Sequence, residues 1–436
     1  MADPFHLSWF LQGSNVQAWG APWTGNIAQE WMTLDLFKHL ARELERACFD
    51  YLLIEDSIYI GESWQNSRDI YLRTGFSCPR QEPSVMSAVL AAATERLGIV
   101  TTLSTFAYAP YLTARLVGTL DQISSGRAGW NVVTGSSDLA AQNLGLEALA
   151  PHDQRYVMAE EYVEIVKRLW ASWEPDVLVD DRKAGILFDP KKVHAIDFKG
   201  QYYSSRGPLN SGPTVQSRPV IAQAGGSEVG MTFAARHADT IVSMPSGVEN
   251  MKRYRDSIRK RMETAGRDPD QCKVLFLVVP IVAETETQAR WLADQRAVQS
   301  EKNIEERLAR LGWVSNIDFS QFDLDQPVGK LETNGNQSIM AQFVQRSGKN
   351  TLREAVVAYY STSYCVDLIG TPDSVASQMQ EVMEEIGGDG FLITLHDLSR
   401  RSLATIIDGL VPELQQRGLV RTGYEHKQLR DNLLAF

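Results

Sequence analysis

Short apolar runs alternate with longer amphipathic segments along nearly the whole 436-residue chain. The runs are rich in β-branched residues, which favour buried strands. We expect eight strands. They are His6–Leu11, Asp50–Glu55, Leu97–Ser104, Gly129–Val133, Pro219–Ala224, Asp239–Met244, Val274–Val282 and Gly390–Leu395.

The segments between the runs have the 3.6-residue period of amphipathic helices. In Leu34–Ala47, for example, Phe37, Leu40 and Leu44 fall near one face with charged residues between them, and Tyr156–Trp170 repeats the pattern. Strands that alternate with helices predict parallel pairing through helical crossovers.

Eight such units, with strands apolar on both faces, predict a single (β/α)8 TIM barrel over residues 1–436. The main alternative is an open doubly wound sheet. That fold favours a G-x-G-x-x-G turn after the first strand, and the sequence has none there.

Two connections are too long for simple loops, one after the fourth strand (about 172–218) and one after the seventh (about 311–351). The second follows a helix expected over Thr285–Arg310. Long insertions in compact domains are often functional, and those on the βα side of a barrel overhang its active site. We therefore expect both to form lids or pocket walls.

Composition narrows the classes of function. With 43 Lys+Arg, 54 Asp+Glu and a net charge of −11, the chain lacks the basic footprint of a nucleic-acid-binding protein. No apolar run is long enough to span a membrane, and the N-terminus does not resemble a secretory signal, so a cytoplasmic protein is expected. The spacing of the Cys and His residues favours neither disulfides nor a metal site, and no G-x-S-x-G nucleophile elbow is present.

Polar residues at strand ends are candidates for ligand contacts, because these ends meet at the barrel mouth. Asp56 follows the second strand, Thr102 lies near the end of the third, and Asn131 is an unusual residue in the fourth. Asn131 must hydrogen-bond to backbone or to a ligand. Asp56 can equally cap a helix or pair with an arginine, and Thr102 can simply favour a strand.

Two segments could bind an anion. After the fifth strand, Gly225, Gly226 and Ser227 precede a helix, so free N–H groups and a hydroxyl suit a phosphate. The segment from His152 to Tyr156, which includes Arg155, is expected to be a loop before a helix and could grip the same anion. The alternatives are a glycine turn with a serine cap, and polar side chains that only cap the second helix.

Three stretches resemble the luciferase-like flavin monooxygenases. They are Gly98–Arg115, Leu120–Thr134 and His152–Tyr156, joined by the tail Arg421–Leu433. Within that family, the chain is similar to the branch of nitrilotriacetate monooxygenase, dibenzothiophene sulfone monooxygenase and pristinamycin synthase. The likeness covers nearly the whole chain and is weakest in Gly13–Thr33 and Leu311–Thr351.

The resemblance implies a barrel that binds FMN in its reduced form, FMNH2, at the mouth and uses O2 to oxygenate a small molecule. A separate NAD(P)H:flavin reductase would supply the FMNH2, and a homo-oligomer, dimer or tetramer, is expected. The branch's flavin-binding positions fall on Asp56, Thr102, His152, Tyr156 and Ser227.

The remaining site assignments combine the resemblance with the residue chemistry. Gly226 adjoins Ser227 at the expected phosphate, and Asn131 would lie beside the isoalloxazine. We expect His152 and Asn131 to be the residues on which catalysis depends, through binding and orientation. Relatives tend to have Pro or Ala before the Asp of the second strand, where this chain has Glu55.

The sequence leaves the substrate open. Phe10 and Phe106, with Trp19, Trp23 and Trp31 of the first loop, would suit an aromatic guest, whereas Arg68, Arg73 and Arg80 would suit a carboxylate. Two other functions remain as alternatives. One is a deazaflavin-dependent oxidoreductase of the same fold, and the other is a non-catalytic flavin-binding barrel.

Overall fold

The structure is a computed structural model. It describes residues 3–12, 30, 33–76, 78–329, 331–348, 350–361, 364–395 and 398–436. Within these ranges the side chains at 297 and 299–301 are not described. Most of the first loop, including Trp19, Trp23 and Trp31, lies outside the described residues.

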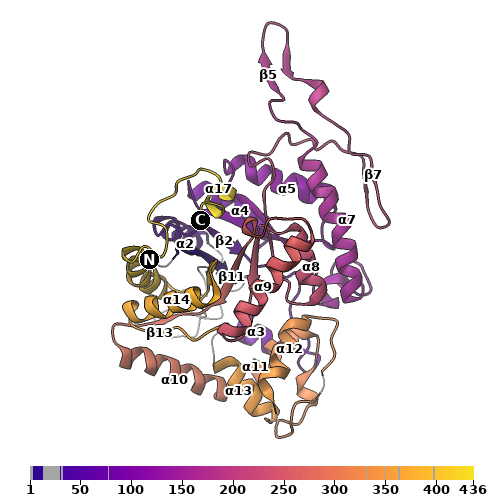
Figure 1. Ribbon diagram of the computed structural model, residues 1–436. Coiled ribbons are helices and arrows are strands. Elements are labelled where there is room, and N and C mark those ends of the chain that lie inside the picture. The colour runs from indigo at the N-terminus through magenta and orange to yellow at the C-terminus, as the bar shows by residue number, and fades with distance from the viewer. Residues whose placement is uncertain are drawn as a thin grey trace.

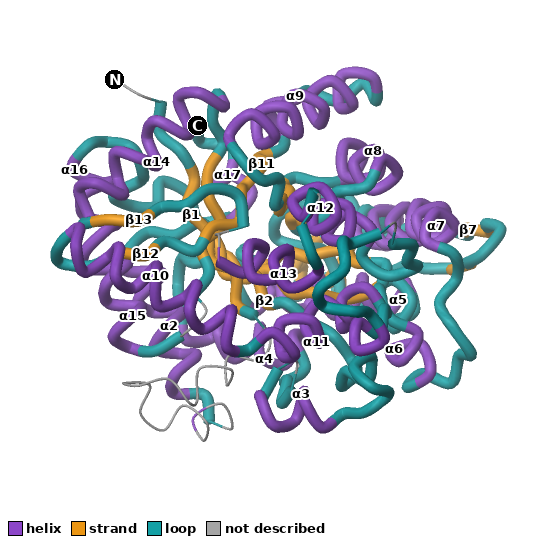
Figure 2. The backbone as a smooth tube through the Cα atoms, turned by 90° about the horizontal axis from the view of Figure 1, so that it is seen from below, coloured by secondary structure: helices purple, strands orange, loops and turns teal. Residues whose placement is uncertain are grey.

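A closed barrel of eight parallel strands forms the centre of the molecule, so the predicted fold is confirmed (Figure 1, Figure 2). The strands follow one another around the barrel in the order β1-β14-β11-β10-β9-β4-β3-β2. Their bounds are β1 (His6–Leu11), β2 (Tyr51–Ile54), β3 (Gly98–Ser104), β4 (Ala128–Val133), β9 (Val220–Gln223), β10 (Thr240–Ser243), β11 (Lys273–Val278) and β14 (Gly390–Ile393).

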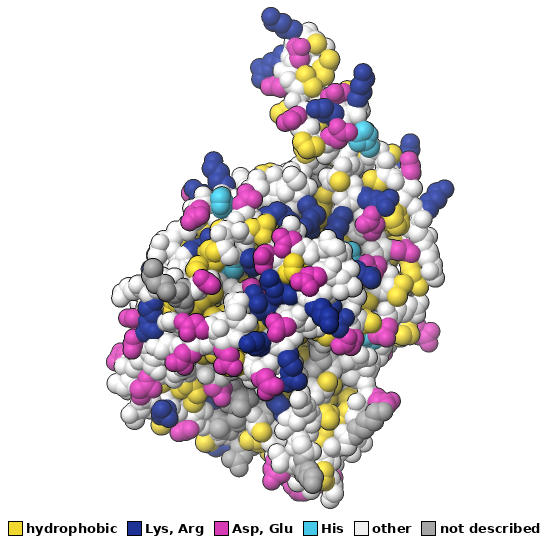
Figure 3. Space-filling view, viewed as in Figure 1, with side chains coloured by type: hydrophobic (Ala, Val, Ile, Leu, Met, Phe, Trp, Pro, Cys, Tyr) yellow, Lys and Arg dark blue, Asp and Glu magenta, His cyan; other side chains and the backbone are white. Residues whose placement is uncertain are grey.

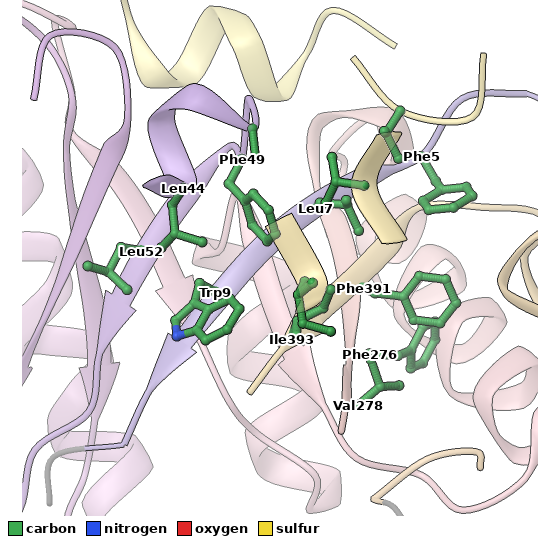
Figure 4. Packing of buried hydrophobic residues seen from close by; sticks show 14 of the residues in the cluster. Phe5, Leu7, Trp9, Leu44, Phe49, Leu52, Phe276, Val278, Phe391 and Ile393 are labelled. Atoms are coloured by element: carbon green, nitrogen blue, oxygen red, sulfur yellow. The ribbon is translucent and has the colours of Figure 1, made fainter. Parts of the chain in front are cut away.

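Side chains alternate between the inside of the barrel and the layer of helices around it. Leu53, Val100 and Leu275 belong to one buried cluster inside the barrel. Their neighbours face outward and pack on helices. Figure 4 shows Trp9 beside Phe49 among such outward-facing residues. This period of two determines which polar side chain near a strand end points into the barrel.

Helices cover the outside of the barrel between the strands (Figure 2). They are α2 (Asp35–Arg46), α3 (Asp69–Thr74), α4 (Pro83–Ala93), α5 (Pro110–Ile123), α6 (Asp138–Gln142), α7 (His152–Trp170), α8 (Glu228–His237), α9 (Val248–Thr264), α10 (Glu286–Lys302), α11 (Ile304–Ser315), α12 (Gln337–Ser347), α13 (Leu352–Ser361), α14 (Pro372–Ile386), α15 (Arg400–Ala404), α16 (Val411–Gln416) and α17 (Leu429–Leu433). No helix in the described ranges has both the length and the apolar character needed to cross a bilayer.

Two predicted elements have different bounds in the structure. The helix expected over Thr285–Arg310 is two helices, because the chain leaves helical geometry at Asn303, and α11 then continues to Ser315. The apolar run Val274–Val282 is also divided. It contains Pro280, which has no N–H for a ladder, and the short β12 (Ile281–Val282) pairs with β13 (Ile369–Gly370) outside the barrel.

The hairpin of the first insertion does not cover the mouth, contrary to the prediction, although Tyr203 of the same insertion reaches the end of β3 and its hydroxyl donates to the Thr105 carbonyl at 3.5 Å. The hairpin, β5 (Leu178–Asp181) with β6 (Ile186–Phe188), projects away from the body at the end opposite to α11, α12 and α13 (Figure 1). The base of the insertion is fixed near the amino ends of the strands, where Gln216 Nε2 donates to the Ala128 carbonyl at 2.8 Å. Only β7 (Phe198–Lys199) and β8 (Ser204–Ser205) run back along α7 (Figure 1).

The second insertion lies over the mouth, as predicted, and is more helical than its polar composition indicates. We call residues 311–351 the lid. The lid packs round buried Trp313, Phe319, Met340 and Phe343. It reaches loops that follow several strands, for example where Asn316 Nδ2 donates to the Ser136 carbonyl at 2.8 Å.

Candidate active site

Thr102 and Asn131 lie side by side at the carboxyl end of the barrel. They are register partners on β3 and β4, and Asn131 Nδ2 donates to Thr102 Oγ1 at 2.9 Å. Trp130, the neighbour of Asn131, packs outward against Tyr162 and Trp170. By strand alternation, Asn131 and Thr102 therefore point into the barrel.

Asn131 has an acceptor with no partner. Its Oδ1 is buried and accepts no hydrogen bond from the described residues, and the residue is 5% exposed. A buried carbonyl oxygen left in this way costs about 1–3 kcal/mol. A ligand with an N–H donor at its edge would satisfy this atom, and an isoalloxazine has such donors.

The turn after β9 forms a cradle of small residues. A Cβ added at Gly225 would lie 2.7 Å from Gln223 Oε1, and one at Gly226 would lie 2.7 Å from Ser338 Cβ. Ser227 caps α8, since its Oγ accepts the Gly230 N–H at 3.2 Å. The capping interpretation is thus correct for Ser227, but the N–H groups earlier in the first turn of α8 have no intrahelical acceptor and suit a phosphate.

His152, Arg155 and Tyr156 do not form a loop, because α7 begins at His152. Arg155 Nε has no hydrogen-bond partner in the described residues, whereas the other two nitrogens of its guanidinium are bonded. Its side chain donates to the Ala150 carbonyl at 2.7 Å and to the Asn334 carbonyl at 3.0 Å. His152 and Tyr156 lie with ring centroids 5.3 Å apart. Asp153 contacts His152 Nδ1 at 2.7 Å.

Tyr156 connects α7 to the glycine turn. Burial raises the pKa of Tyr156, and hydrogen bonding to Thr134, Gln223 and Ser227 opposes this rise. Its hydroxyl oxygen lies 2.9 Å from where a Cβ on Gly230 would be. The structure therefore brings Tyr156 and Ser227 together, as expected for two parts of one anion site.

Sequence reasoning missed Gln223, the last residue of β9. It is buried, and its Oε1 accepts the Gly225 N–H at 2.5 Å, which fixes the start of the glycine turn. The available signal was a glutamine inside the apolar run Pro219–Ala224, comparable with Asn131 in β4.

The lid contacts both the start of α7 and the glycine turn after β9. Asn334 Oδ1 accepts the backbone N–H of His152 at 3.0 Å, and Ser338 lies against Gly226. Sequence reasoning placed the lid over the mouth but named neither residue. Their polar character is ordinary for a loop and gave no signal.

The two predicted substrate contacts also lie at the mouth. Phe10, in β1, is half-buried against the cluster inside the barrel. Phe106 follows β3, and its ring would lie 2.6 Å from a Cβ at Gly135, where φ is +84°. A glycine at 135 thus both permits this turn and leaves room for the ring.

Asp56 opens onto a cavity of about 410 Å³ beside the end of β2, which we call the Arg80 cavity. Its lining includes Asp56, Tyr59, Cys78, Arg80, Glu82 and Tyr108. Burial raises the pKa of Asp56 to about 7, and the Arg80 guanidinium opposes that rise. Asp56 therefore carries a proton in a large fraction of molecules at neutral pH.

The raised pKa of Asp56 predicts a dependence of stability on pH. Between pH 4 and pH 7 the unfolded chain has lost this proton while the folded protein keeps it, so this group lowers stability as pH rises. Asp56→Asn should remove that loss. The melting temperature of Asp56→Asn minus that of wild type should rise from pH 4 to pH 7 and then level off, and a difference constant with pH would contradict the assignment.

The described residues hold no group of three or more His, Cys, Asp or Glu side chains able to bind a metal ion. None of the four cysteines forms a disulfide in the structure. The polar groups at the mouth instead suit an organic ligand with a hydrogen-bonding edge and an anionic end.

The chain is similar to several known proteins over nearly its whole length. Residues 8–390 match the family described as luciferase-like monooxygenase. The chain is 34% identical to a dibenzothiophene-sulfone monooxygenase of Rhodococcus erythropolis (strain XP), covering 98% of this chain and 96% of that protein. It is also 34% identical to nitrilotriacetate monooxygenase component A of Aminobacter aminovorans, over 98% and 96% of the two chains. A solved structure of a riboflavin lyase with modified FMN and its substrate riboflavin superposes with a TM-score of 0.90 at 30% identity, over 100% of this chain and 96% of that one.

Proposed function

This chain belongs to the luciferase-like monooxygenase family, and from that premise we propose that it is the oxygenating component of a two-component system. It would take FMNH2 from a separate NAD(P)H:flavin reductase and use O2 to oxygenate a small organic molecule. The name "component A" of one relative supports a second component. Reduced FMN, when bound, supplies the electrons that activate O2.

The observation that carries the proposal is the polar set at the mouth. Asn131, in β4, offers an unpartnered Oδ1. The second group of residues lies where the turn after β9 meets the start of α7, and consists of Gly226, Ser227, His152 and Tyr156. A flavin needs these two chemistries at once, a hydrogen-bonding site for its ring and an anion site for its phosphate. Thr102 would orient Asn131, and the lid would exclude water.

A coupled assay tests this function. The protein is supplied with a flavin reductase, FMN and NADH, and with a panel of organic sulfur, nitrogen and chlorinated compounds under ¹⁸O₂. We expect one labelled oxygen atom in the product and no product when the reductase is omitted. A parallel reaction is run in H₂¹⁸O with unlabelled O2, and label that enters the product only there would indicate hydrolysis. Flavin that binds without any turnover would support the non-catalytic barrel.

We further propose that the chain forms a homo-oligomer through the arm, residues 176–189. The arm stands away from the body and exposes apolar side chains beside charged ones (Figure 3). Leu178, Val179, Ile186 and Leu187 are each 44–61% exposed. An isolated two-stranded hairpin is only marginally stable in water, so a second copy that covers these residues would stabilise it. Acidic Asp180 and Asp181 beside basic Arg182 and Lys183 suit contact between identical chains.

Charged substitutions in the arm should therefore dissociate the oligomer. The double variant Leu178→Asp and Leu187→Asp should have the mass of a single chain in light scattering, while its circular dichroism remains that of the wild type. Leu112→Asp, on the exposed face of α5, is the matched control, since Leu112 is 49% exposed. A wild type that is itself monomeric, or a double variant that keeps its oligomeric mass, would contradict the proposal.

A further inference from the structure

Two of the three guanidinium nitrogens of Arg80 are buried at the mouth without a hydrogen-bond partner in the described residues. Its side chain is 8% exposed, and neither Nε nor Nη1 forms a hydrogen bond with the described residues. The nearest carboxylate oxygen, Glu55 Oε2, is 3.8 Å from Nη1, beyond hydrogen-bond distance. Buried guanidinium groups are normally paired, because an unpaired charge in this position is costly.

An aromatic ring of the lid packs against this group. Arg80 lies 5.8 Å from the centre of the Trp313 ring in the lid, and Tyr59 stacks on the same ring at 5.4 Å. A guanidinium that packs against a ring can still donate from its N–H groups to an acceptor in its own plane. Nε and Nη1 donate from different edges of the guanidinium, and each can bond to an anionic oxygen such as that of a carboxylate.

The acidic residues of the cavity leave room for one more negative charge. Glu82 is occupied, because its Oε2 accepts the Val85 N–H at 2.7 Å and its Oε1 accepts the Tyr108 hydroxyl at 3.0 Å. Burial raises the pKa of Asp56 to about 7, so Asp56 can hold a proton and does not have to repel an anion. Glu55 is an ion-pair partner of Arg80, at a distance too long for a hydrogen bond.

The size and position of the Arg80 cavity also suit a substrate. Its volume of about 410 Å³ lies within the range of small-molecule sites. It adjoins Asp56, which is one of the proposed flavin contacts, so a molecule held by Arg80 would extend toward the flavin. Ile58, Ile60 and Pro79 add apolar surface for the rest of that molecule.

We propose that Arg80 binds a carboxylate of the substrate, so that this enzyme acts on a small organic acid with an apolar or thioether body. The proposal deepens the function proposed above and rests on it. Arg68, a candidate of the same kind in sequence, is excluded from this role because its side chain is 63% exposed and paired with Glu62.

The test uses (phenylthio)acetate and its methyl ester, which differ in charge and little in shape. Calorimetric titration of the FMN-loaded wild type should give a Kd for the acid at least about tenfold below that for the ester, the difference expected for one charge-assisted pair. Arg80→Gln should remove this preference, Arg80→Lys should retain part of it, and Arg68→Gln should leave it unchanged. Circular dichroism of each variant verifies folding, and the comparison of acid and ester in the wild type needs no variant.

The outcomes separate the two proposals. Equal binding of acid and ester to the wild type, or an acid preference that survives in a folded Arg80→Gln, overturns the role of Arg80. If neutral sulfides are oxygenated and acids are neither bound nor oxidised, the oxygenase function stands and the carboxylate site is wrong. If acids bind through Arg80 and no compound gains oxygen from ¹⁸O₂, the carboxylate site stands and the oxygenase function is wrong.

Discussion

Asn131→Ala is expected to lower product formation about ten- to hundredfold and to raise the release of hydrogen peroxide per NADH consumed. The substitution removes both the unpartnered Oδ1 and the Nδ2 that donates to Thr102. Loss of about 1–3 kcal/mol of hydrogen bonding to a bound ring corresponds to this range of rates. A ring that is poorly oriented, in a site that admits water, directs electrons to O2 without oxygenating the substrate. His152→Ala should act in the same direction.

The measurement compares product, NADH consumption and hydrogen peroxide in one coupled reaction. Thr101→Val is the matched control, because Thr101 Oγ1 is also buried and unpartnered, on the strand position next to Thr102. By strand alternation Thr101 faces away from the barrel interior. It should therefore keep the wild-type ratio of product to hydrogen peroxide. If Thr101→Val and Asn131→Ala lose turnover equally, the effect comes from the sheet and not from a ligand at Asn131.

The barrel could be predicted because its signal is local and repeated. Apolar runs such as Pro219–Ala224 lie within about a residue of the strands observed, and Leu34–Ala47 contains α2. The misplaced boundaries depend on single residues. Pro280 ends β11 early, and nothing in the helical period reveals the break at Asn303.

The candidate site was predictable where a polar residue interrupts a buried strand. Asn131 in β4 is such a residue, and the structure shows the unpartnered atom that the interruption indicated. Residues from the lid could not be found in this way. Asn334 and Trp313 are distant in sequence from His152 and Tyr59, and only the packing of the lid places them in contact.

The insertions show a second limit of sequence reasoning. Both have the length of a lid, but one leaves the end of α7 at the amino side of the barrel and the other lies on the mouth. The first insertion lies between α7 and β9 and so starts at the amino face, whereas the second lies between β11 and α14, on the strand-to-helix side that opens onto the mouth. The position of each insertion relative to its helix is therefore more informative than its length or its glycine content.

FMNH2 is expected to bind at least about tenfold more tightly than reduced riboflavin, because the site at Ser227, His152 and Tyr156 is suited to a phosphate that riboflavin lacks. Ser227→Ala should weaken FMNH2 by about 1–3 kcal/mol and leave the affinity for reduced riboflavin unchanged. Riboflavin is the necessary control, because Ser227 also caps α8 and its loss lowers stability with either ligand. Anaerobic titration of both flavins into both proteins gives the four affinities.

Gly226 tests the same site by its shape. A Cβ at this position would lie 2.7 Å from Ser338 Cβ, so Gly226→Ala must displace either the turn or the lid. We expect Gly226→Ala to weaken FMNH2 more than reduced riboflavin, and Ser338→Gly in the same chain to restore much of the affinity by removing the atom in conflict. Equal losses for the two flavins would mean that the turn supports the fold of the mouth and does not contact a phosphate. An unchanged FMNH2 affinity in Gly226→Ala would remove the phosphate from this turn altogether.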